Sequence, residues 1–398
     1  MKKKPGASTR CVHSVRYEPP RTVPVSLPIF ASSTWDFTDE ALRAFSSGEG
    51  RAMAGKGDYI YGRYGSPTTR AVEKALATLE GAESGVVFSS GMAAISSTVL
   101  SHLDAGGSIA SSSQLYGVTH SLFTKTLPKM GMEVGFTDPS DIGGFERALK
   151  KGAALIYVES ASNPLMRVPD FGALAKLSRT FKVPIIVDNT FMTPVNFRPL
   201  EHGAAVSVHS ATKYLGGHSD IVMGAACASE RRCAAIWDEM LRLGGCADPF
   251  QTFLLARGLK TLALRVGRQN KNAMALASEL EGAKGVERMH YPGLASHPDH
   301  AIARKLFDGY GGMLSIDVKG GARAATRFMR SLKFGREATS LGGVETLVST
   351  PYNTSHTWIS EKERLALGIT NGLVRVSVGI EDAADLIEDF KNALKLSL

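Results

Sequence analysis

Residues 210–220 read SATKYLGGHSD, a run in which Lys213 stands between short hydroxyl side chains and a pair of glycines. Ser210 and Thr212 can donate hydrogen bonds to a phosphate, and the glycines at 216–217 let the backbone approach a ligand closely. We interpret Lys213 as a lysine that forms a Schiff base with a carbonyl group, which would make the protein an enzyme. A solvated lysine in a surface loop is the alternative interpretation.

Apolar runs alternate with helical patterns on both sides of this lysine. Strands are expected at residues 85–88, 132–136, 154–159, 183–188 and 204–208, and further along the chain at 313–318 and 373–378. Such alternation predicts an α/β fold, with a mostly parallel sheet and helices on both faces. Open sheets of this kind bind ligands at the carboxyl ends of their strands, and Lys213 lies just past the run 204–208.

The chain has 398 residues, which is long enough for two domains with separate cores. Residues 1–60 are rich in Pro, Ser and Gly and predict an extended N-terminal arm. Residues 61–262 predict the α/β domain that carries Lys213, and residues 263–398 predict a smaller C-terminal α+β domain. A long helical pattern from about Phe250 to Leu280 connects the α/β domain to the C-terminal domain.

The composition is that of an ordinary soluble protein, with 43% hydrophobic and 21% charged residues. The net charge is +8, but the basic residues are dispersed apart from Lys2–Lys4, so we expect no nucleic-acid partner. Four cysteines show no disulfide or metal spacing, and His297 and His300 lack further ligands, so we expect a cytoplasmic protein without a metal. We also expect no secretory signal and no membrane span.

Two further groups could complete a site around Lys213. Residues 89–94 read SSGMAA and open a predicted helix after a predicted strand, so their N–H groups and the helix dipole could bind phosphate. Small residues also open helices for packing reasons. Asp188 ends the strand 183–188, where it could pair with a pyridinium nitrogen or cap the next helix or turn. The order of these parts matches a pyridoxal-phosphate site.

The whole sequence resembles the Cys/Met-metabolism family of pyridoxal-phosphate enzymes, which includes methionine γ-lyase, cystathionine lyases and cystathionine γ-synthase. Residues 210–220 are highly specific to this family. Similar segments follow in order along nearly the whole chain: Tyr61–Arg63, Ser90–Met92, Tyr116–Gly117, Asn163–Pro164, Val187–Thr190, Arg257–Leu262, Ser340–Gly343 and Arg375–Gly379. The resemblance implies a fold-type I enzyme, similar to aspartate aminotransferase, with pyridoxal 5'-phosphate as its cofactor.

The resemblance also implies a role for each matching residue. Lys213 would bind the cofactor as a Schiff base and then move protons between substrate carbons, for which its amine must be neutral. Asp188 would pair with the pyridinium nitrogen. Tyr116 would stack on the cofactor ring and donate or accept a proton near the departing sulfur. Taken singly, residues such as Tyr116 could instead be ordinary packing residues.

The remaining matched residues would bind the phosphate and the substrate. By resemblance, the phosphate site contains Ser90, Gly91, Met92, Ser210 and Thr212, joined by Tyr61 and Arg63 from a neighbouring subunit. Arg375 and Ser340, with Asn163, would hold the substrate carboxylate and the ring hydroxyl of the cofactor, because an arginine can bind a carboxylate bidentately. The resemblance therefore implies an active site assembled only in a dimer, and a homotetramer built from such dimers.

Three positions depart from the patterns of family members. Ile60 and Thr339 stand where members that use cystathionine commonly carry a glutamate, which favours an uncharged substrate tail. Val118 stands where methionine γ-lyases typically have a cysteine. Our leading hypothesis is a carbon–sulfur lyase that acts by γ-elimination on methionine, homocysteine or cystathionine and releases an α-keto acid, ammonia and a thiol. A γ-replacement synthase and a non-catalytic cofactor-binding regulator are the alternatives.

Overall fold

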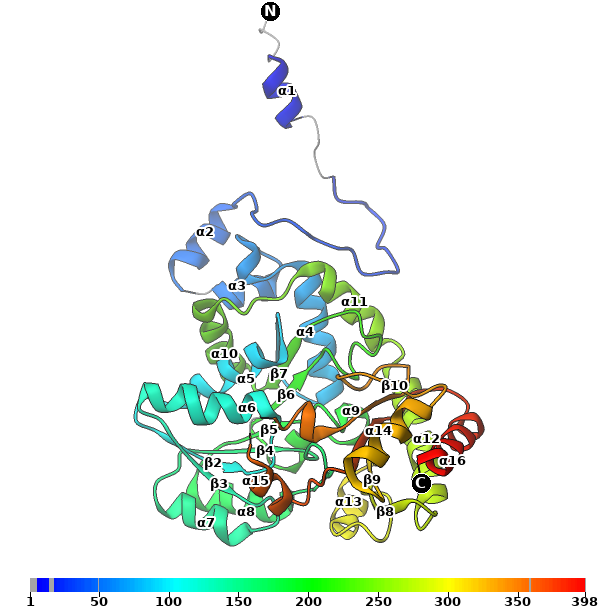
Figure 1. The fold of residues 1–398 in the computed structure, drawn as a ribbon. Helices are drawn as coiled ribbons and strands as arrows, with labels where there is room; N and C mark the ends of the chain where they lie inside the picture. The colour runs from blue at the N-terminus through cyan, green and yellow to red at the C-terminus, as the bar shows by residue number, and fades with distance from the viewer. Residues whose placement is uncertain (1–5, 14–17, 49, 358, 398) are drawn as a thin grey trace, which may run out of the picture.

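The computed structural model describes residues 6–13, 18–48, 50–357 and 359–397, which form two separate sheets (Figure 1). The larger sheet has the strand order β1-β7-β6-β5-β4-β2-β3. Its strands are β1 (Ser84–Phe88), β2 (Ser108–Ser112), β3 (Glu133–Thr137), β4 (Leu155–Glu159), β5 (Ile185–Asp188), β6 (Val206–Ser210) and β7 (Gly224–Ala228). β7 is antiparallel to both neighbours, and the other pairs are parallel. The predicted mostly parallel sheet is confirmed, although β2 and β7 are not among the expected strands.

Helices cover both faces of the larger sheet because consecutive strand residues point to opposite sides. In β5, for example, Ile185 and Val187 join one core and Ile186 joins the other. The first face is covered by α4 (Pro67–Glu80), α7 (Ile142–Lys150), α8 (Phe171–Phe181) and α11 (Pro249–Leu259). The second face is covered by α5 (Gly91–Leu100) and α10 (Glu230–Leu243). Burial on both faces explains why the central strands read as continuous apolar runs.

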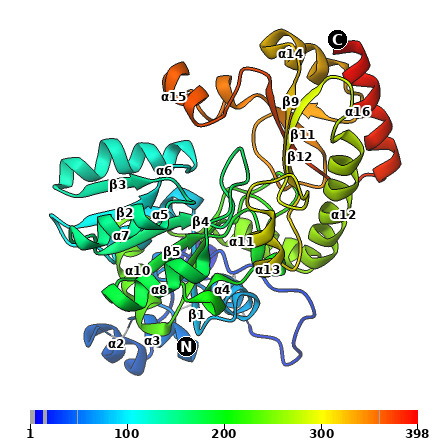
Figure 2. The same cartoon turned by 90° about the horizontal axis from the view of Figure 1, so that it is seen from below.

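The smaller sheet has the strand order β10-β11-β12-β9-β8 and is mostly antiparallel (Figure 2). Its strands are β8 (Val286–His290), β9 (Met313–Val318), β10 (Arg336–Glu337), β11 (Leu347–Ser349) and β12 (Leu373–Ser377). A third core joins this sheet to α12 (Leu262–Leu280), α14 (Gly321–Ser331) and α16 (Ala383–Ser397). The smaller sheet and these three helices therefore form an α+β unit, while the domain boundaries at residues 60 and 262 stay predictions.

The helical pattern expected from about Phe250 to Leu280 corresponds to two helices. α11 ends at Leu259 and α12 begins at Leu262, and Thr261 between them has non-helical backbone angles. Gly258 lies so close to the carbonyl of Gly216 that a Cβ would not fit between them. This contact fixes the end of α11 against the loop after Lys213, and the chain must turn before it can continue as α12.

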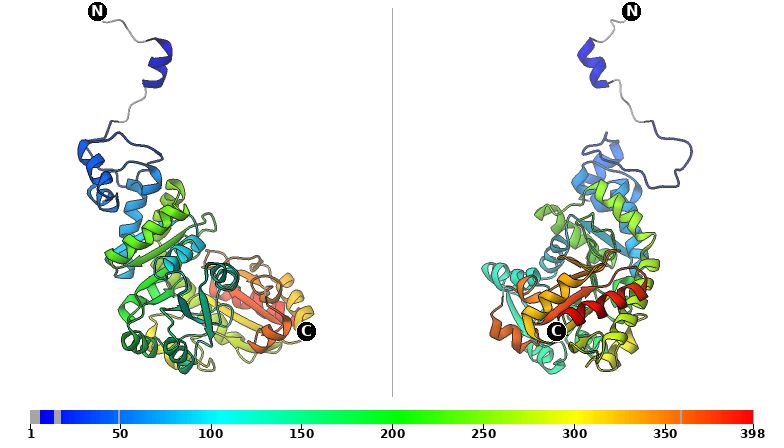
Figure 3. Two further views of the ribbon diagram at one scale, coloured as in Figure 1. Left: turned by 90° about the vertical axis from the view of Figure 1, so that its left-hand side faces the viewer. Right: turned by 45° about the vertical axis from the view of Figure 1, so that its right-hand side comes forward.

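The N-terminal region is not extended throughout. Its described residues include three short helices, α1 (Ala7–His13), α2 (Asp39–Ser46) and α3 (Gly50–Lys56). Thr38 caps α2 by accepting a hydrogen bond from the N–H of Ala41, a start signal too local to appear as periodicity. Helix α1 lies away from the body, whereas α2 and α3 lie against it (Figures 1 and 3), and Lys2–Lys4 lie outside the described residues. Among the helices of the described ranges, none has both the length and the apolar character that crossing a membrane requires.

Candidate active site

A cavity of about 550 Å³ opens where three central strands end. β4 ends at Glu159, β5 at Asp188 and β6 at Ser210, and all three residues line the cavity. The lining also brings together most of the residues predicted from the sequence: Ser90, Gly91, Met92, Tyr116, Asn163, Asp188, Ser210, Thr212, Lys213, Ser340 and Arg375. The cavity therefore lies at the carboxyl edge of the parallel strands, where α/β sheets bind ligands.

Lys213 lies in the turn after β6 and lines the cavity. Its backbone N–H donates to the carbonyl of Ser210 at 3.2 Å, so the turn begins where the strand ends. Its Nζ donates to the hydroxyl of Ser340 at 2.8 Å. Burial, helped by the nearby Arg375 cation, lowers the pKa of Lys213 from 10.5 to about 8. The neutral amine is therefore much more populated near neutral pH than in an exposed lysine, as a nucleophile or base requires.

The lowered pKa of Lys213 predicts how cofactor capture depends on pH. A lysine with a depressed pKa is neutral above about pH 8, whereas an ordinary lysine stays charged up to about 10.5. The rate at which apo protein captures pyridoxal phosphate should therefore rise with pH through a midpoint near 8. Stopped-flow absorbance measures this rate, and a simple alkylamine under the same conditions corrects for the titration of the cofactor itself. A midpoint near 10.5 would contradict the prediction.

Two carboxyl groups, Asp188 and Glu159, lie side by side at the ends of β5 and β4. Burial raises the pKa of each, and the charge of Asp188 raises the pKa of Glu159 further. Thr190 donates to Oδ1 of Asp188 from its hydroxyl at 2.5 Å and from its N–H at 3.0 Å, whereas Glu159 accepts the N–H of Tyr116 at 2.6 Å. We infer an ionised Asp188 beside a protonated Glu159, an arrangement that a cationic ring nitrogen at Asp188 would stabilise.

The N-terminus of α5 forms a cradle suited to a phosphate. Ser90 caps the helix by accepting a hydrogen bond from the N–H of Ala93 at 3.1 Å. The N–H groups of Gly91 and Met92 precede the first bonds within the helix and lie at the cavity wall. Gly91 also packs against Ser210, where a Cβ would come within 2.8 Å of the serine Cβ. The glycine therefore lets the helix start approach the end of β6 closely.

The two hydroxyls flanking the lysine differ in their surroundings. The hydroxyl of Thr212 donates to the carbonyl of Met223 at 3.1 Å and accepts the Met223 N–H at 3.0 Å. The hydroxyl hydrogen of Thr212 is therefore already used in a bond to Met223. To bind a phosphate, the hydroxyl would have to turn away from Met223. Ser210 ends β6 at the cavity wall beside Gly91, which makes it the better placed of the two donors.

Gly216 and Gly217 are not part of the cavity wall, which corrects the expectation that they admit a ligand. Gly217 has a φ of +75°, and a Cβ there would collide with the guanidinium of Arg265 on α12. That guanidinium is buried and donates to the carbonyls of Tyr214 and Gly258 at 2.7 Å each. The glycines therefore serve packing, because they let α11 and α12 approach the loop that holds the lysine.

Gly217→Ala should lower the free energy of unfolding by about 3 kcal/mol, because left-handed strain adds to a collision with the hydrogen-bonded Arg265. Gly244→Ala is a matched control: its φ is +78°, but no heavy atom lies within 4 Å of the added Cβ. The Gly244→Ala change should lower the free energy of unfolding by about 1 kcal/mol. Urea unfolding of both variants measures the difference, and equal losses would show that the Arg265 contact contributes nothing.

Arg375 is a buried cation that has no carboxylate partner within the described part of the chain. It stands on β12 between Val374 and Val376, which face the core of the smaller sheet, so its side chain points to the opposite side, toward the cavity. It donates to the carbonyl of Ser340 at 2.9 Å and to Oδ1 of Asn163 at 3.4 Å. Burial lowers the pKa of Arg375 to about 10, which leaves it charged at neutral pH. An incoming carboxylate would offset the cost of this buried charge.

Tyr61 and Arg63 do not line the cavity of their own chain. Tyr61 is 46% exposed, and Arg63 donates to a backbone carbonyl of α10 at 3.2 Å. Ile60 is buried against α2. Two other positions depart from the family patterns. Thr339 lines the cavity, whereas Val118 lies on α6 (Gly117–Ser121), where it is exposed and does not line the cavity.

The lining also contains residues that the sequence did not single out as site residues. They are Ile95, Glu159, Ala161, Thr190, Phe191, Val222, Leu341, Thr354 and Ser355. Glu159 carries a usable signal, because it ends the predicted strand 154–159 as Asp188 ends its own. Thr190 follows Asp188 by two residues, a spacing at which an aspartate side chain commonly accepts the backbone N–H. The others reach the cavity through tertiary packing and have no local signal.

These groups fit pyridoxal phosphate at each of its reactive or charged parts. The start of α5 suits the phosphate, Asp188 suits the ring nitrogen, and Lys213 suits the aldehyde carbon. When bound, the cofactor supplies an electron sink for charge that develops on the substrate α-carbon. The fold and the site together define a fold-type I pyridoxal-phosphate-dependent enzyme.

The chain belongs to the Cys/Met metabolism PLP-dependent enzyme family, whose sequence pattern matches residues 8–395. The L-methionine gamma-lyase of Fusobacterium nucleatum subsp. nucleatum is 38% identical over 374 residues, which cover 93% of each protein. The cystathionine gamma-lyase of Bacillus subtilis is 39% identical over 397 residues, which cover 99% of this chain and 100% of that protein. The crystal structure of cystathionine gamma synthase from Xanthomonas oryzae pv. oryzae with aminoacrylate and cysteine matches with a TM-score of 0.87 at 35% identity, covering 94% of this chain and 93% of that one. The predicted family, fold class and cofactor are confirmed.

Proposed function

We propose that the protein is a carbon–sulfur lyase that removes the γ-sulfur group from methionine or homocysteine. With water, the products are an α-keto acid, ammonia and a thiol or sulfide. The observation that carries the proposal is the placement of Lys213 beside Arg375 in one cavity. The arginine supplies a cation for the substrate carboxylate, and the lysine supplies a base whose pKa allows proton removal near neutral pH. The similarity to methionine and cystathionine gamma-lyases supports this assignment.

Each residue of the site would act at a defined atom. The guanidinium of Arg375 would bind both oxygens of the substrate carboxylate and hold the α-carbon near Lys213. Nζ of Lys213, oriented by the Ser340 hydroxyl, would take the α-proton and then exchange protons at the β-carbon. Tyr116, whose side chain borders the cavity, would donate a proton to the departing sulfur. Asp188 would keep the ring nitrogen of the cofactor protonated.

The cavity lining favours a substrate whose tail is uncharged. Its carboxyl groups are Asp188 and Glu159, which end β5 and β4. The remaining polar lining contributed by the segments after residue 330 includes hydroxyls at Thr339, Thr354 and Ser355. A distal ammonium group, as in cystathionine, would find no free carboxylate among these residues, whereas a thioether or thiol needs none.

The proposal is tested by a product screen with purified, cofactor-loaded protein. Methionine and homocysteine should release α-ketobutyrate and a volatile thiol or sulfide faster than cystathionine releases its products. Absence of α-ketobutyrate from all three substrates would overturn the lyase assignment. Supplying a homoserine ester with and without a thiol tests the synthase alternative, because a γ-replacement enzyme should gain flux when the thiol is present.

We further propose that the active site is completed by a second copy of the chain, and that two such dimers form a homotetramer. Tyr61 and Arg63, which the family resemblance assigns to the phosphate site, lie outside the cavity of their own chain. The arm also exposes apolar side chains, with Val23 at 92% and Val25 at 101%, as expected of a surface that another subunit covers. Light scattering measures the mass of the assembly, and a monomer that binds cofactor tightly would contradict the shared site.

A cytoplasmic location is also proposed. Cys227, Cys233 and Cys246 are free thiols, two of them buried, which suits a reducing compartment. Cell fractionation with an antibody to the protein tests the location, and recovery in a secreted fraction would contradict it.

A further inference from the structure

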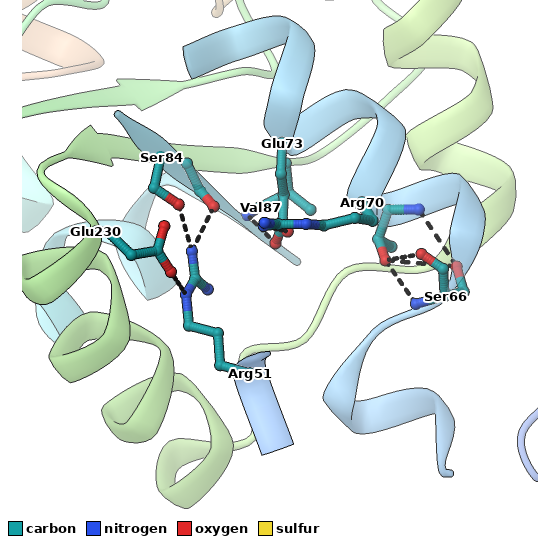
Figure 4. A network of polar contacts seen from close by, with 9 residues as sticks. Arg51, Ser66, Arg70, Glu73, Ser84, Val87 and Glu230 are labelled. Carbon is teal, nitrogen blue, oxygen red and sulfur yellow. Dashed lines mark hydrogen bonds and ion pairs between the residues drawn. The ribbon is translucent and has the colours of Figure 1, made fainter. Parts of the chain in front are cut away.

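We infer that Arg51 is a positioning residue that holds the segment of residues 57–65 so that Tyr61 and Arg63 can complete the phosphate site of a neighbouring subunit. This inference rests on the proposed dimer-built site and identifies the contacts that hold the contributed segment. Figure 4 shows these contacts: Arg51 reaches Ser84 and Glu230, and Arg70 pairs with Glu73, which bonds Val87 of β1. Arg51 does not line the cavity, so it would act through the segment alone.

Arg51 joins α3 to the body through a buried guanidinium. Its side chain is 9% exposed. Its Nη2 donates to the hydroxyl of Ser84 at 2.8 Å and to the carbonyl of Gly85 at 3.1 Å, both at the start of β1. Its Nε lies 3.2 Å from Oε1 of Glu230, the first residue of α10. One side chain therefore fixes α3 against the larger sheet and against a helix that covers it.

A second set of contacts holds the other end of the segment. Ser66 caps α4 in a capping box, which fixes the point where the segment enters the helix. Arg70, one turn later, pairs through Nη1 with Oε2 of Glu73 at 3.2 Å. Oε1 of Glu73 accepts the N–H of Val87 in β1 at 3.4 Å. Both ends of the segment are thus attached to the same edge strand.

The two sets of contacts are linked electrostatically through Glu73. Burial raises the pKa of this carboxyl, and the nearby cations Arg51 and Arg70 lower it. The two arginines therefore offset part of the effect of burial and favour the ionised form of this carboxyl group, which in turn holds the start of α4 to β1. Loss of Arg51 would weaken the attachment at both ends, because Glu73 would lose one of its two compensating charges.

Between these attachments the segment contacts the preceding N-terminal residues and α10, the latter through the Arg63 donation to the carbonyl of Leu241 at 3.2 Å and through an aromatic contact. The N–H of Gly62 donates to the carbonyl of Ser33 at 2.8 Å, so this backbone bond ends on the arm and not on the body. The ring of Tyr64 packs on Trp237 of α10 with centroids 5.7 Å apart. Tyr61 itself faces outward. Without Arg51, ordering the segment at a neighbouring site would cost additional conformational entropy.

Arg51→Met is the informative change because it keeps the unbranched apolar stem and removes the guanidinium. Glu230 is 56% exposed at its side chain, so water can solvate the carboxylate that loses its partner. The core strands keep their backbone pairing, since β1 remains paired with β7. We therefore expect the main effect on the position of α3 and of the segment that follows it.

The test compares two mixed dimers that have the same composition. Both contain one Arg51→Met change and one Lys213→Ala change, and both are isolated by two affinity tags after co-expression. In the first arrangement the two changes lie on one chain and the partner is wild type. In the second they lie on different chains. Only a chain with Lys213 develops visible absorbance when it links pyridoxal phosphate, so a titration reports the intact-lysine site alone.

The first arrangement should bind pyridoxal phosphate about tenfold more weakly than the second, because its intact site receives Tyr61 and Arg63 from the Arg51→Met chain. A general loss of stability would affect both arrangements equally. Equal dissociation constants, or weaker binding in the second arrangement, would overturn the inference.

The same two arrangements with Arg63→Ala in place of Arg51→Met test the shared site itself. A difference with Arg63→Ala but none with Arg51→Met would overturn the role of Arg51 and leave the shared site standing. No difference with Arg63→Ala would overturn the shared site and the inference with it. Cofactor binding without release of α-keto acid would overturn the lyase proposal alone, because the titration does not depend on turnover.

Discussion

Lys213→Ala should lower the turnover of every accepted sulfur amino acid by at least about a thousandfold, because cofactor attachment and proton transfer both use this amine. The visible absorbance of the linked cofactor should also be lost. The cavity itself should persist, since the Nζ hydrogen bond joins two side chains, Lys213 and Ser340, and is not part of a strand or helix. Assays of α-keto acid at saturating cofactor, with absorbance spectra of the same samples, measure both effects.

Lys176→Ala on the exposed face of α8 is the matched control, and it should leave turnover and spectrum unchanged. Turnover of Lys213→Ala within about tenfold of the wild type would show that another group carries the proton transfer. Wild-type turnover that disappears in Lys213→Ala would exclude the non-catalytic regulator.

Arg375→Gln should raise KM for the amino-acid substrate by about a hundredfold, since the variant loses the charged, forked donor for the carboxylate. Removing this cation should also raise the pKa of Lys213 above its wild-type value of about 8. The pH midpoint of cofactor capture should therefore move upward in the same variant. Steady-state kinetics and the capture experiment measure these two effects independently.

Two further variants sharpen the interpretation of Arg375. Arg375→Lys keeps a charge but loses the fork, so it should restore the low midpoint of cofactor capture more fully than it restores KM. Arg323→Gln, on the exposed face of α14, should change neither quantity. A normal KM in Arg375→Gln would show that the substrate carboxylate binds elsewhere.

The strands that could be predicted from the sequence are those with bulky apolar side chains. β5 and β9 contain Ile, Val, Leu or Met in succession, and both were predictable from these runs. β2 reads SIASS and β7 reads GAACA, and small residues of this kind carry no clear strand signal. They become strands because each is paired on both sides, β2 with β3 and β4 and β7 with β1 and β6.

The site was predictable from local signals only where a residue ends a strand or starts a helix. Asp188, Lys213 and the turn at Ser90 have such positions, whereas Asn163 and Arg375 come from distant segments, and only the family resemblance pointed to them. The true role of Gly217 depends on contact with Arg265 of a later helix, which no local pattern reveals. Tertiary packing thus explains most of what the sequence left open.

The amine of Lys213 donates its hydrogen bond to Ser340 and owes its depressed pKa in part to Arg375, and both residues come from the portion of the chain that builds the smaller sheet. If that portion moved away from the larger sheet, Lys213 would lose both influences and hold its proton more tightly. The low pKa of this base therefore depends in part on contact between the two sheets around the cavity. The protonation of a single nitrogen is therefore coupled to how closely the two sheets approach each other.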